Sequence, residues 1–353
     1  MGLVGHPRPE MIANFAVTYK CNSRCSICSI WKTADPTAGE LTLDEIREFF
    51  TSESEFLSGV KSVQLTGGEP FLRPDLIYIA ESIWRNIPGA FIWIATNGTL
   101  PDFVVRETEA MLSMPGRGGL GVTVSIDGIG ETHDSQRGVD GAYEKTLRTL
   151  AGLSELRSQN HNMNLSVGMT LTPLNQREIT SVMRVAEAHG ADYSIRPVNV
   201  SELYYRNEPV AGLWDMEAVR GGLKAIEEMY IRRRGVIGAS SVISYLMRIP
   251  QYISTGTREI PCTAGTSSFF LDPNGRVYPC LFMDRKMGDI REAPLKKSWG
   301  SVDAEAVRRE IREGHCPRCW VECEAMREIR RDKIGLGAAA LRGSLGKVFN
   351  PSF

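Results

Sequence analysis

Three cysteines, at positions 21, 25 and 28, stand close together near the start of the chain with the spacing C-x3-C-x2-C. Thiolates are ligands for zinc and for iron–sulfur clusters, and a closed site of either kind takes four ligands. The histidines nearest to the triplet in sequence are His6 and His133, so no fourth zinc ligand stands beside it. The spacing therefore indicates a metal site that lacks one ligand, half of a zinc site, or the remnant of a disulfide.

The other five cysteines form a second group near the end of the chain, at 262, 280, 316, 319 and 323. The stretch 266–280 has two strand-like runs around a turn at 272–275, which predicts a hairpin that brings Cys262 and Cys280 together. On a helix, Cys319 and Cys323 would lie one turn apart on the same face. These positions predict a second thiolate site, with zinc as the alternative to an iron–sulfur cluster.

The composition is typical of a soluble globular protein and does not indicate a highly charged partner. It has 353 residues, of which 42% are hydrophobic and 24% charged, and a formal net charge of -1. This balance argues against a nucleic-acid partner, and no apolar run approaches the ~18 residues that span a bilayer. Because the N-terminal residues lack a signal-peptide pattern, we expect a cytoplasmic protein, whose clustered cysteines bind metal rather than form disulfides.

Six short apolar runs alternate with longer amphipathic stretches along the first two thirds of the chain. We predict strands at 11–19, 60–66, 90–96, 120–126, 164–172 and 192–198, and helices at 41–50, 74–87, 101–113, 141–158, 175–189 and about 213–233. Thr42 and Glu45 form a capping box at the start of the first helix. This alternation predicts an α/β fold with a parallel sheet, either doubly wound or a partial (β/α)6 TIM-like barrel, and we favour the barrel.

The alternation stops after residue 235. We therefore predict a (β/α)6 partial barrel over 1–235, a small α+β domain over 236–334 that contains the second cysteine group, and a C-terminal tail over 335–353. Polar or glycine-rich residues follow every predicted strand of the barrel. Because the carboxyl ends of parallel strands share one face, we expect these residues to form one site.

The cysteine triplet and the sequence Gly67, Gly68, Glu69, Pro70 together closely resemble the radical S-adenosylmethionine enzymes, over almost the whole chain. In that family the three cysteines hold a [4Fe-4S] cluster, and the fourth iron is bound by the amino and carboxylate groups of S-adenosylmethionine. The resemblance implies that this cofactor is the missing ligand. It also implies reductive cleavage to a 5′-deoxyadenosyl radical, which abstracts hydrogen from the substrate, and a flavodoxin- or ferredoxin-type electron donor.

The resemblance assigns further residues to the cofactor. It implies that Gly67, Gly68, Glu69 and Pro70 line the methionine moiety, with the glycines letting the backbone approach closely. Asn97, Ser125 and Asp127 match positions that reach the ribose or carboxylate, Arg137 in "HDSQRG" would pair with the carboxylate, and Thr170, Asn175 and Arg196 are further candidates. For each polar residue a loop or cap hydrogen bond is the alternative. One departure is Ile27, which stands where the family often has an aromatic residue before the last cysteine.

The run from Cys262 through Gly275 to Cys280, C-x12-G-x4-C, resembles the opening of the auxiliary-cluster domains called SPASM and twitch. Five cysteines suffice for one auxiliary [4Fe-4S] cluster and not for two, so either four ligate and one is spare, or three ligate and one iron is open. Four ligands would suit a cluster that moves electrons in a two-electron oxidation. A free cysteine could instead return a hydrogen atom to a substrate radical, as an epimerase needs.

We therefore predict a radical enzyme that attacks an unactivated C–H position of a small molecule such as a sugar, cyclitol or lipid precursor. The first predicted strand begins near residue 11, so we expect no N-terminal peptide-recognition domain, which favours a small molecule over a peptide. The alternatives are a maturase of ribosomal peptides or proteins, by cross-linking, epimerisation or residue oxidation, and a non-catalytic iron–sulfur or zinc protein. No general base is assigned; Glu202, Tyr204 and Tyr205 lie beyond the sixth strand and are candidates.

Overall fold

The computed structural model describes residues 10–33, 35, 37–332 and 335–341, and these residues contain one nine-stranded sheet. The strands are β1 Met11–Ala16, β2 Val60–Thr66, β3 Phe91–Thr96, β4 Leu120–Ser125, β5 Met163–Leu171, β6 Asp192–Pro197, β7 Ser268–Leu271, β8 Arg276–Tyr278 and β9 Gly288–Asp289. Each strand from β1 to β6 pairs in parallel with the next, as the six predicted β-α units require. The predicted α/β partial barrel is confirmed.

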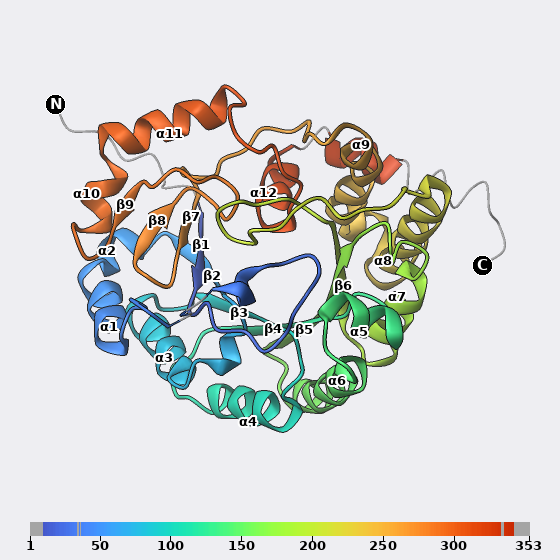
Figure 1. The fold of residues 1–353 in the computed structure, drawn as a ribbon, viewed down its shortest axis with the longest axis horizontal. Helices are drawn as coiled ribbons and strands as arrows, with labels where there is room; N and C mark the ends of the chain where they lie inside the picture. The colour runs from blue at the N-terminus through green and yellow to red at the C-terminus, as the bar shows by residue number, and fades with distance from the viewer. Residues whose placement is uncertain (1–9, 34, 36, 333–334, 342–353) are drawn as a thin grey trace.

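Helices connect the parallel strands and cover their outer face, while others follow the last strand of the sheet, β9. They are α1 Leu43–Ser52, α2 Ser54–Leu57, α3 Leu76–Asn86, α4 Pro101–Leu112, α5 Glu131–Arg137, α6 Ala142–Gln159, α7 Ile179–Ala188, α8 Met216–Leu246, α9 Ile249–Thr255, α10 Leu295–Trp299, α11 Val302–Arg312 and α12 Glu322–Arg331, with short 3-10 turns at Ile30–Lys32 and Pro70–Leu72. Figure 1 shows α1, α3, α4, α6 and α7 as an arc outside the strands, with the dark blue loop that follows β1 in the middle of the view. The predicted capping box of α1 is confirmed, since Thr42 accepts from the Glu45 backbone and Glu45 from that of Thr42.

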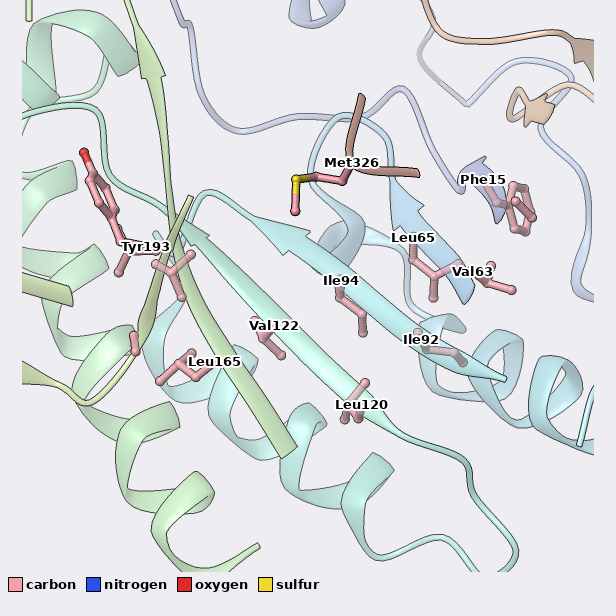
Figure 2. Packing of buried hydrophobic residues seen from close by; sticks show 14 of the residues in the cluster. Phe15, Val63, Leu65, Ile92, Ile94, Leu120, Val122, Leu165, Tyr193 and Met326 are labelled. Atoms are coloured by element: carbon pink, nitrogen blue, oxygen red, sulfur yellow. The ribbon is translucent and has the colours of Figure 1, made fainter. Parts of the chain in front are cut away.

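The hydrophobic core lies between the strands and these helices. Side chains alternate along each strand, and the buried set on the helix-facing side includes Val63, Leu65, Ile92, Ile94, Leu120 and Val122 (Figure 2). The residues between them face the inside of the barrel, where Gln64, Thr123 and Ser194 are only half-buried. The inner face is therefore polar enough to hold a site, while the outer face supplies the stability.

The C-terminal part continues the sheet instead of standing apart from it. β7 pairs in parallel with β1, through Ile12 to Phe15 against Ser268 to Leu271. β7 and β8 form the predicted hairpin, and β9, which was not predicted, adds to β8 in antiparallel order. α12 packs against α8, and Met326 of α12 belongs to the main core. A pairing between strands some 250 residues apart leaves no local pattern in the sequence, which explains why the sequence predicted only a hairpin.

The predicted limits of the domains stay a prediction. Residue 235 falls inside α8, where Gly235 has non-helical angles of φ 68 and ψ 169 and divides the helix into two parts. Of the predicted tail, 335–341 is helical and the rest lies outside the described residues. Among the residues that the structure describes, no helix is both long and apolar enough to cross a membrane.

Candidate active site

The carboxyl ends of all six parallel strands open on one cavity of about 130 Å³. Its walls include Cys21, Cys25 and Cys28 from the loop after β1, and Gly67 and Gly68 from the loop after β2. Asn97, Ser125, Arg137, Thr170 and Arg196 complete the set of predicted cofactor residues that line it. The structure thus brings these ten residues, which the sequence scatters over nearly 180 positions, to one place.

The two glycines after β2 allow the loop to approach the chain after β1. The Gly68 N–H donates to the Thr18 carbonyl at 2.7 Å, and the Glu69 N–H donates to the Lys20 carbonyl at 2.8 Å. A Cβ on Gly67 would stand 2.3 Å from the Thr18 oxygen, and one on Gly68 would stand 2.2 Å from that of Lys20. The sequence assigned these glycines to contact with a ligand. Their closest contacts are with the backbone that carries the cysteines, so they position the cysteine loop.

Two residues predicted to line the cofactor cavity, Glu69 and Pro70, do not line it. Glu69 is 1% exposed, and its carboxylate accepts from the Thr96 hydroxyl at 2.9 Å, from the Asn97 N–H at 2.7 Å and from the Phe71 N–H at 3.2 Å. Pro70 is buried at the start of a 3-10 turn. The carboxylate therefore ties the loop after β2 to the loop after β3 from behind the cavity wall.

Asn97 carries this connection on to the cysteines. Its side-chain amide donates to the Asn22 side chain at 2.7 Å and to the Ser23 hydroxyl at 3.0 Å, and both residues follow Cys21 directly. Burial raises the pKa of Glu69 to about 7, although the hydrogen bonds that it accepts from Asn97, Thr96 and Phe71 act in the opposite direction. Three loops of the barrel are thus joined by one buried carboxylate and one amide.

Asp127 and Arg137 form the charged part of the site. The Arg137 guanidinium lies 2.6 Å from the Asp127 carboxylate and 3.9 Å from the Cys25 sulfur. Asp127 is fully buried and also accepts from the Thr170 N–H at 2.7 Å, so it supports the wall without lining the cavity. The backbone at the end of α5 holds the cysteine loop, through Arg24 N–H to the Arg137 carbonyl at 2.8 Å. Asn175, a weaker candidate, is buried and bonds only to its neighbours, including the Asp127 carbonyl.

The cysteine triplet has the donor chemistry that an iron–sulfur cluster needs. Among the described residues, no group of three or more His, Cys, Asp or Glu side chains lies close enough together to hold a metal ion. Burial raises the pKa of Cys21 to about 11 and that of Cys28 to about 12, so the protein alone does not stabilise their thiolates. A cationic metal group would do so. Three thiols around one hollow, beside an Arg137 Nε that is buried without a partner, fit a thiolate-bound cluster with an anionic cofactor group.

The C-terminal cysteines gather beside the barrel. Burial is the main cause that raises the pKa of Cys280, and the nearby Cys262 sulfur is the second. Burial also raises the pKa of Cys319 most, followed by the sulfurs of Cys280 and Cys262. Cys316 lies close enough to Cys262 to act on it in the same way. The side chains that act most strongly on Cys323 are charged: Glu324, Arg327, Arg196 and Glu322. Cys262, Cys280, Cys316 and Cys319 are thus linked as neighbours in pairs, and Cys323 has Arg196 of β6 among its neighbours.

Asn199, which the sequence analysis did not single out, holds this group against the barrel. Its side-chain oxygen accepts from the Trp320 N–H at 3.0 Å and from the Tyr252 hydroxyl at 2.7 Å, and its nitrogen donates to the Trp320 carbonyl at 3.1 Å. Trp320 is fully buried and follows Cys319 directly. The Asn199 side chain therefore bonds to both backbone groups of Trp320, as a neighbouring β-strand would, and so holds the segment that contains Cys319. A buried asparagine after a strand is the only sequence signal for this role, and many loops share it.

A second cavity, of about 750 Å³, adjoins the first. Val198, Asn199 and Phe282 line both cavities, and Cys319 lines the larger one. Its walls include Val200, Trp214, Tyr252 and Ile253, while Glu202, Asp284 and Arg285 also line it. Of the candidates beyond β6, Tyr204 and Tyr205 line the first cavity. Tyr204 is a positioning residue, because its hydroxyl donates to the Gly67 carbonyl at 2.7 Å.

The partial barrel has three thiols at the carboxyl ends of its strands and further cysteines beside them, which are the donors that thiolate-bound metal clusters need. Family models match accordingly: the radical SAM superfamily over residues 15–186 and the SPASM iron–sulfur cluster-binding domain over 262–324. The chain belongs to the radical SAM superfamily, and its cofactors are S-adenosylmethionine and [4Fe-4S] clusters.

The names of individual relatives describe different products. The chain is 30% identical to the AdoMet-dependent heme synthase of Methanosarcina barkeri over 88% of each chain. It is 23% identical to the subtilosin biosynthesis protein AlbA of Bacillus subtilis, over 88% of this chain and 63% of AlbA, which is less than two thirds of that relative. These relatives support a radical SAM enzyme with a SPASM-type domain. They leave open whether the substrate is a small molecule or a peptide.

Solved structures share the fold at low sequence identity. Streptococcus suis SuiB bound to S-adenosylmethionine superposes with a TM-score of 0.62 at 14% identity, over 85% of this chain and 68% of SuiB. Native anSMEcpe with bound AdoMet and a peptide gives a TM-score of 0.61 at 16% identity, over 98% of this chain and 100% of anSMEcpe. At this identity the likeness shows the fold alone.

Glu69→Gln should lower the free energy of unfolding of the cluster-free, reduced protein by about 1–3 kcal/mol at acidic pH, because the amide turns two N–H donors toward groups that themselves donate, where the protonated carboxyl has one O–H. Since the folded pKa of Glu69 is about 7 and the ordinary value is 4.5, the folded wild type holds a proton that the unfolded chain releases. Wild-type stability therefore falls as pH rises through this window, and the deficit of the variant should shrink. Urea unfolding across the window measures both effects. Glu81→Gln, on the surface, is the control; a deficit that is equal in both variants would contradict the role of Glu69.

Asn199→Ala should lower the free energy of unfolding by about 1–3 kcal/mol, because the buried N–H and carbonyl of Trp320 lose their partner. We also expect reconstituted protein to lose iron from the C-terminal cysteines first, which iron analysis with and without a C-terminal cysteine substitution would measure. The control is Asn86→Ala, whose amide bonds only to the Ser82 carbonyl within its own helix. If Asn199→Ala behaves like this control, Asn199 does not position the cysteine segment.

Proposed function

We propose that this chain cleaves S-adenosylmethionine at the smaller cavity and attacks a C–H position of a small molecule that is held in the larger one. The observation that carries this proposal is that Val198, Asn199 and Phe282 line both cavities, so the two lie side by side. When bound, the cluster and S-adenosylmethionine supply an electron and a 5′-deoxyadenosyl radical that removes a hydrogen atom. The protein's own residues hold the cofactor, orient the substrate and exclude water.

The larger cavity has the properties of a small-molecule site. Its volume of about 750 Å³ falls inside the range of roughly 300–1,000 Å³ that such sites occupy. Trp214, Tyr252, Ile253 and Phe282 give it apolar and aromatic walls, which would keep water from a reactive radical. These features support oxidation or rearrangement of a small molecule over peptide maturation.

For the second cysteine group we propose four cluster ligands and one free thiol. Cys262, Cys280, Cys316 and Cys319 would hold an auxiliary [4Fe-4S] cluster, because each of them has another of the four as a neighbour, and Cys323, on which charged side chains act most strongly, would remain free. Cys319 lines the larger cavity, so a cluster on this ligand would lie next to the substrate. A short path for an electron from a substrate radical supports oxidation as the outcome.

Among small molecules, the likeness to heme synthases over most of the chain supports a tetrapyrrole as a candidate, next to the sugar, cyclitol or lipid precursor that the sequence suggested. The likeness to AlbA supports a peptide as the competing class. A panel with one representative of each class, assayed for substrate-dependent 5′-deoxyadenosine formation, separates these possibilities.

Anaerobically reconstituted and reduced protein should convert S-adenosylmethionine to 5′-deoxyadenosine and methionine, which liquid chromatography detects. Cys25→Ala should abolish the product, because the triplet then has two thiols left for the cluster. Ser26→Ala, an exposed neighbour in the same loop, is the matched control and should retain it. Absence of cleavage in wild-type protein with intact clusters would contradict the proposed function.

Iron content tests the second group separately. Wild-type protein should bind about eight irons per chain, as two [4Fe-4S] clusters require, and Cys280→Ala should bind about four. Cys323→Ala, the matched control on the proposed free thiol, should keep about eight. About four irons with one zinc in the wild type would reassign the second site to zinc, and loss of iron in Cys323→Ala would make that cysteine a ligand.

A further inference from the structure

Arg196 is a cation on the inner face of the barrel. It lies in β6, pairs in register with Thr170 of β5, and its side chain lines the smaller cavity. The residue is exposed, unlike Arg137, the other arginine that lines this cavity. Among the described residues it makes no side-chain hydrogen bond or ion pair.

The other arginines in this region are already occupied. Arg137 pairs with Asp127 at 2.6 Å. Arg73, behind the glycine loop, pairs with Asp75 at 2.6 Å and donates to the Val17 and Leu41 carbonyls. A guanidinium that lines a cavity without a carboxylate paired to it is free to pair with an anionic ligand, and its planar fork of donors matches such a ligand. Arg196 therefore marks the part of the cavity that an anion should occupy.

The surroundings of Arg196 include two carboxylates, and each of them is engaged by another residue: Asp127 by Arg137, and Glu322 by the hydroxyl of Ser194. Its other electrostatic neighbours are Tyr205, Tyr245 and Cys323. The Tyr245 hydroxyl is buried with no hydrogen-bond partner, and its ring stacks on Trp320 at 5.3 Å. Asp127 is fully buried and engaged by Arg137. Burial opposes the charge of Arg196, and these neighbours outweigh it, so its pKa is raised and it stays charged.

The place of Arg196 argues for the substrate and against the cofactor. Arg137 lies 3.9 Å from Cys25, next to the cluster that the cofactor would complete. Arg196 instead neighbours Cys323, on the side of the C-terminal cysteines. Val198, two residues further along the chain, lines both cavities. Arg196 thus lines the smaller cavity, two residues before a residue that lines both cavities.

We propose that the substrate is an organic acid and that Arg196 binds its carboxylate, with the body of the molecule in the larger cavity. One planar guanidinium matches one carboxylate in a bidentate pair, whereas a phosphate dianion would leave a charge unpaired. The carboxylate would fix the position of the neighbouring carbon atoms relative to the radical source. This inference rests on the proposed function, because it names the class of substrate for the same site.

Binding of a simple acid to the reconstituted holoprotein, with S-adenosylmethionine present, tests the inference. The probes are hexanoate, its uncharged analogue hexanamide, and inorganic phosphate, titrated by calorimetry under anaerobic conditions. Wild-type protein should bind hexanoate at least about tenfold more tightly than hexanamide or phosphate, since the loss of one charge-assisted pair is worth that much or more. Arg196→Gln should lose this preference, and Arg196→Lys, which keeps the charge without the fork, should retain part of it.

The control is Arg234→Gln, which removes an exposed arginine that pairs with Asp192 at the opposite end of β6. It should bind hexanoate as the wild type does. Equal binding of hexanoate by Arg196→Gln, equal binding of hexanamide by the wild type, or tighter binding of phosphate would each overturn the proposal. So would a loss of affinity for S-adenosylmethionine in Arg196→Gln as large as its loss for hexanoate, because Arg196 would then serve the cofactor. None of these results depends on cofactor cleavage, so failure of the proposed function would be recognised separately.

Discussion

The buried carboxylate of Glu69 is the constraint on which the cofactor site depends. It accepts hydrogen bonds from the loop after β3, while its own N–H reaches the loop after β1. Asn97, held by this carboxylate, then bonds to the two residues that follow Cys21. A metal group with an open coordination position needs ligands that stay in place without a fourth protein ligand, and a connected polar network inside a low dielectric gives such rigidity.

The same device recurs where distant segments meet. Asn199 takes the place of a strand partner for Trp320, and the Tyr204 hydroxyl bonds to the Gly67 carbonyl across the mouth of the barrel. Each side chain satisfies a backbone group that would otherwise be buried without a partner. The cofactor cavity and the C-terminal cysteines are therefore positioned by a few buried polar side chains, while the apolar core outside the strands supplies the stability.

Local patterns in the sequence were enough to predict the six strands, most helices and the residues of the shared face. The cysteine spacing and the glycine pair were enough to predict the family. The pairing of β1 with β7 was not predictable, because it joins segments that share no local signal. The family resemblance assigned Glu69 to the methionine moiety together with the two glycines, whereas its three hydrogen bonds turn the carboxylate away from the cavity. The roles of Asn199 and of the Arg196 guanidinium depend on neighbours that are distant in sequence, so they could not be predicted from the sequence.

The central claim is that S-adenosylmethionine supplies the ligand that the three cysteines lack. Electron paramagnetic resonance of the reduced Cys280→Ala protein tests it most directly, because this variant should carry only the cluster of Cys21, Cys25 and Cys28. Addition of S-adenosylmethionine should shift the g values of the cluster, since binding to an iron changes its electronic surroundings. A spectrum that is unchanged at saturating S-adenosylmethionine would contradict the account.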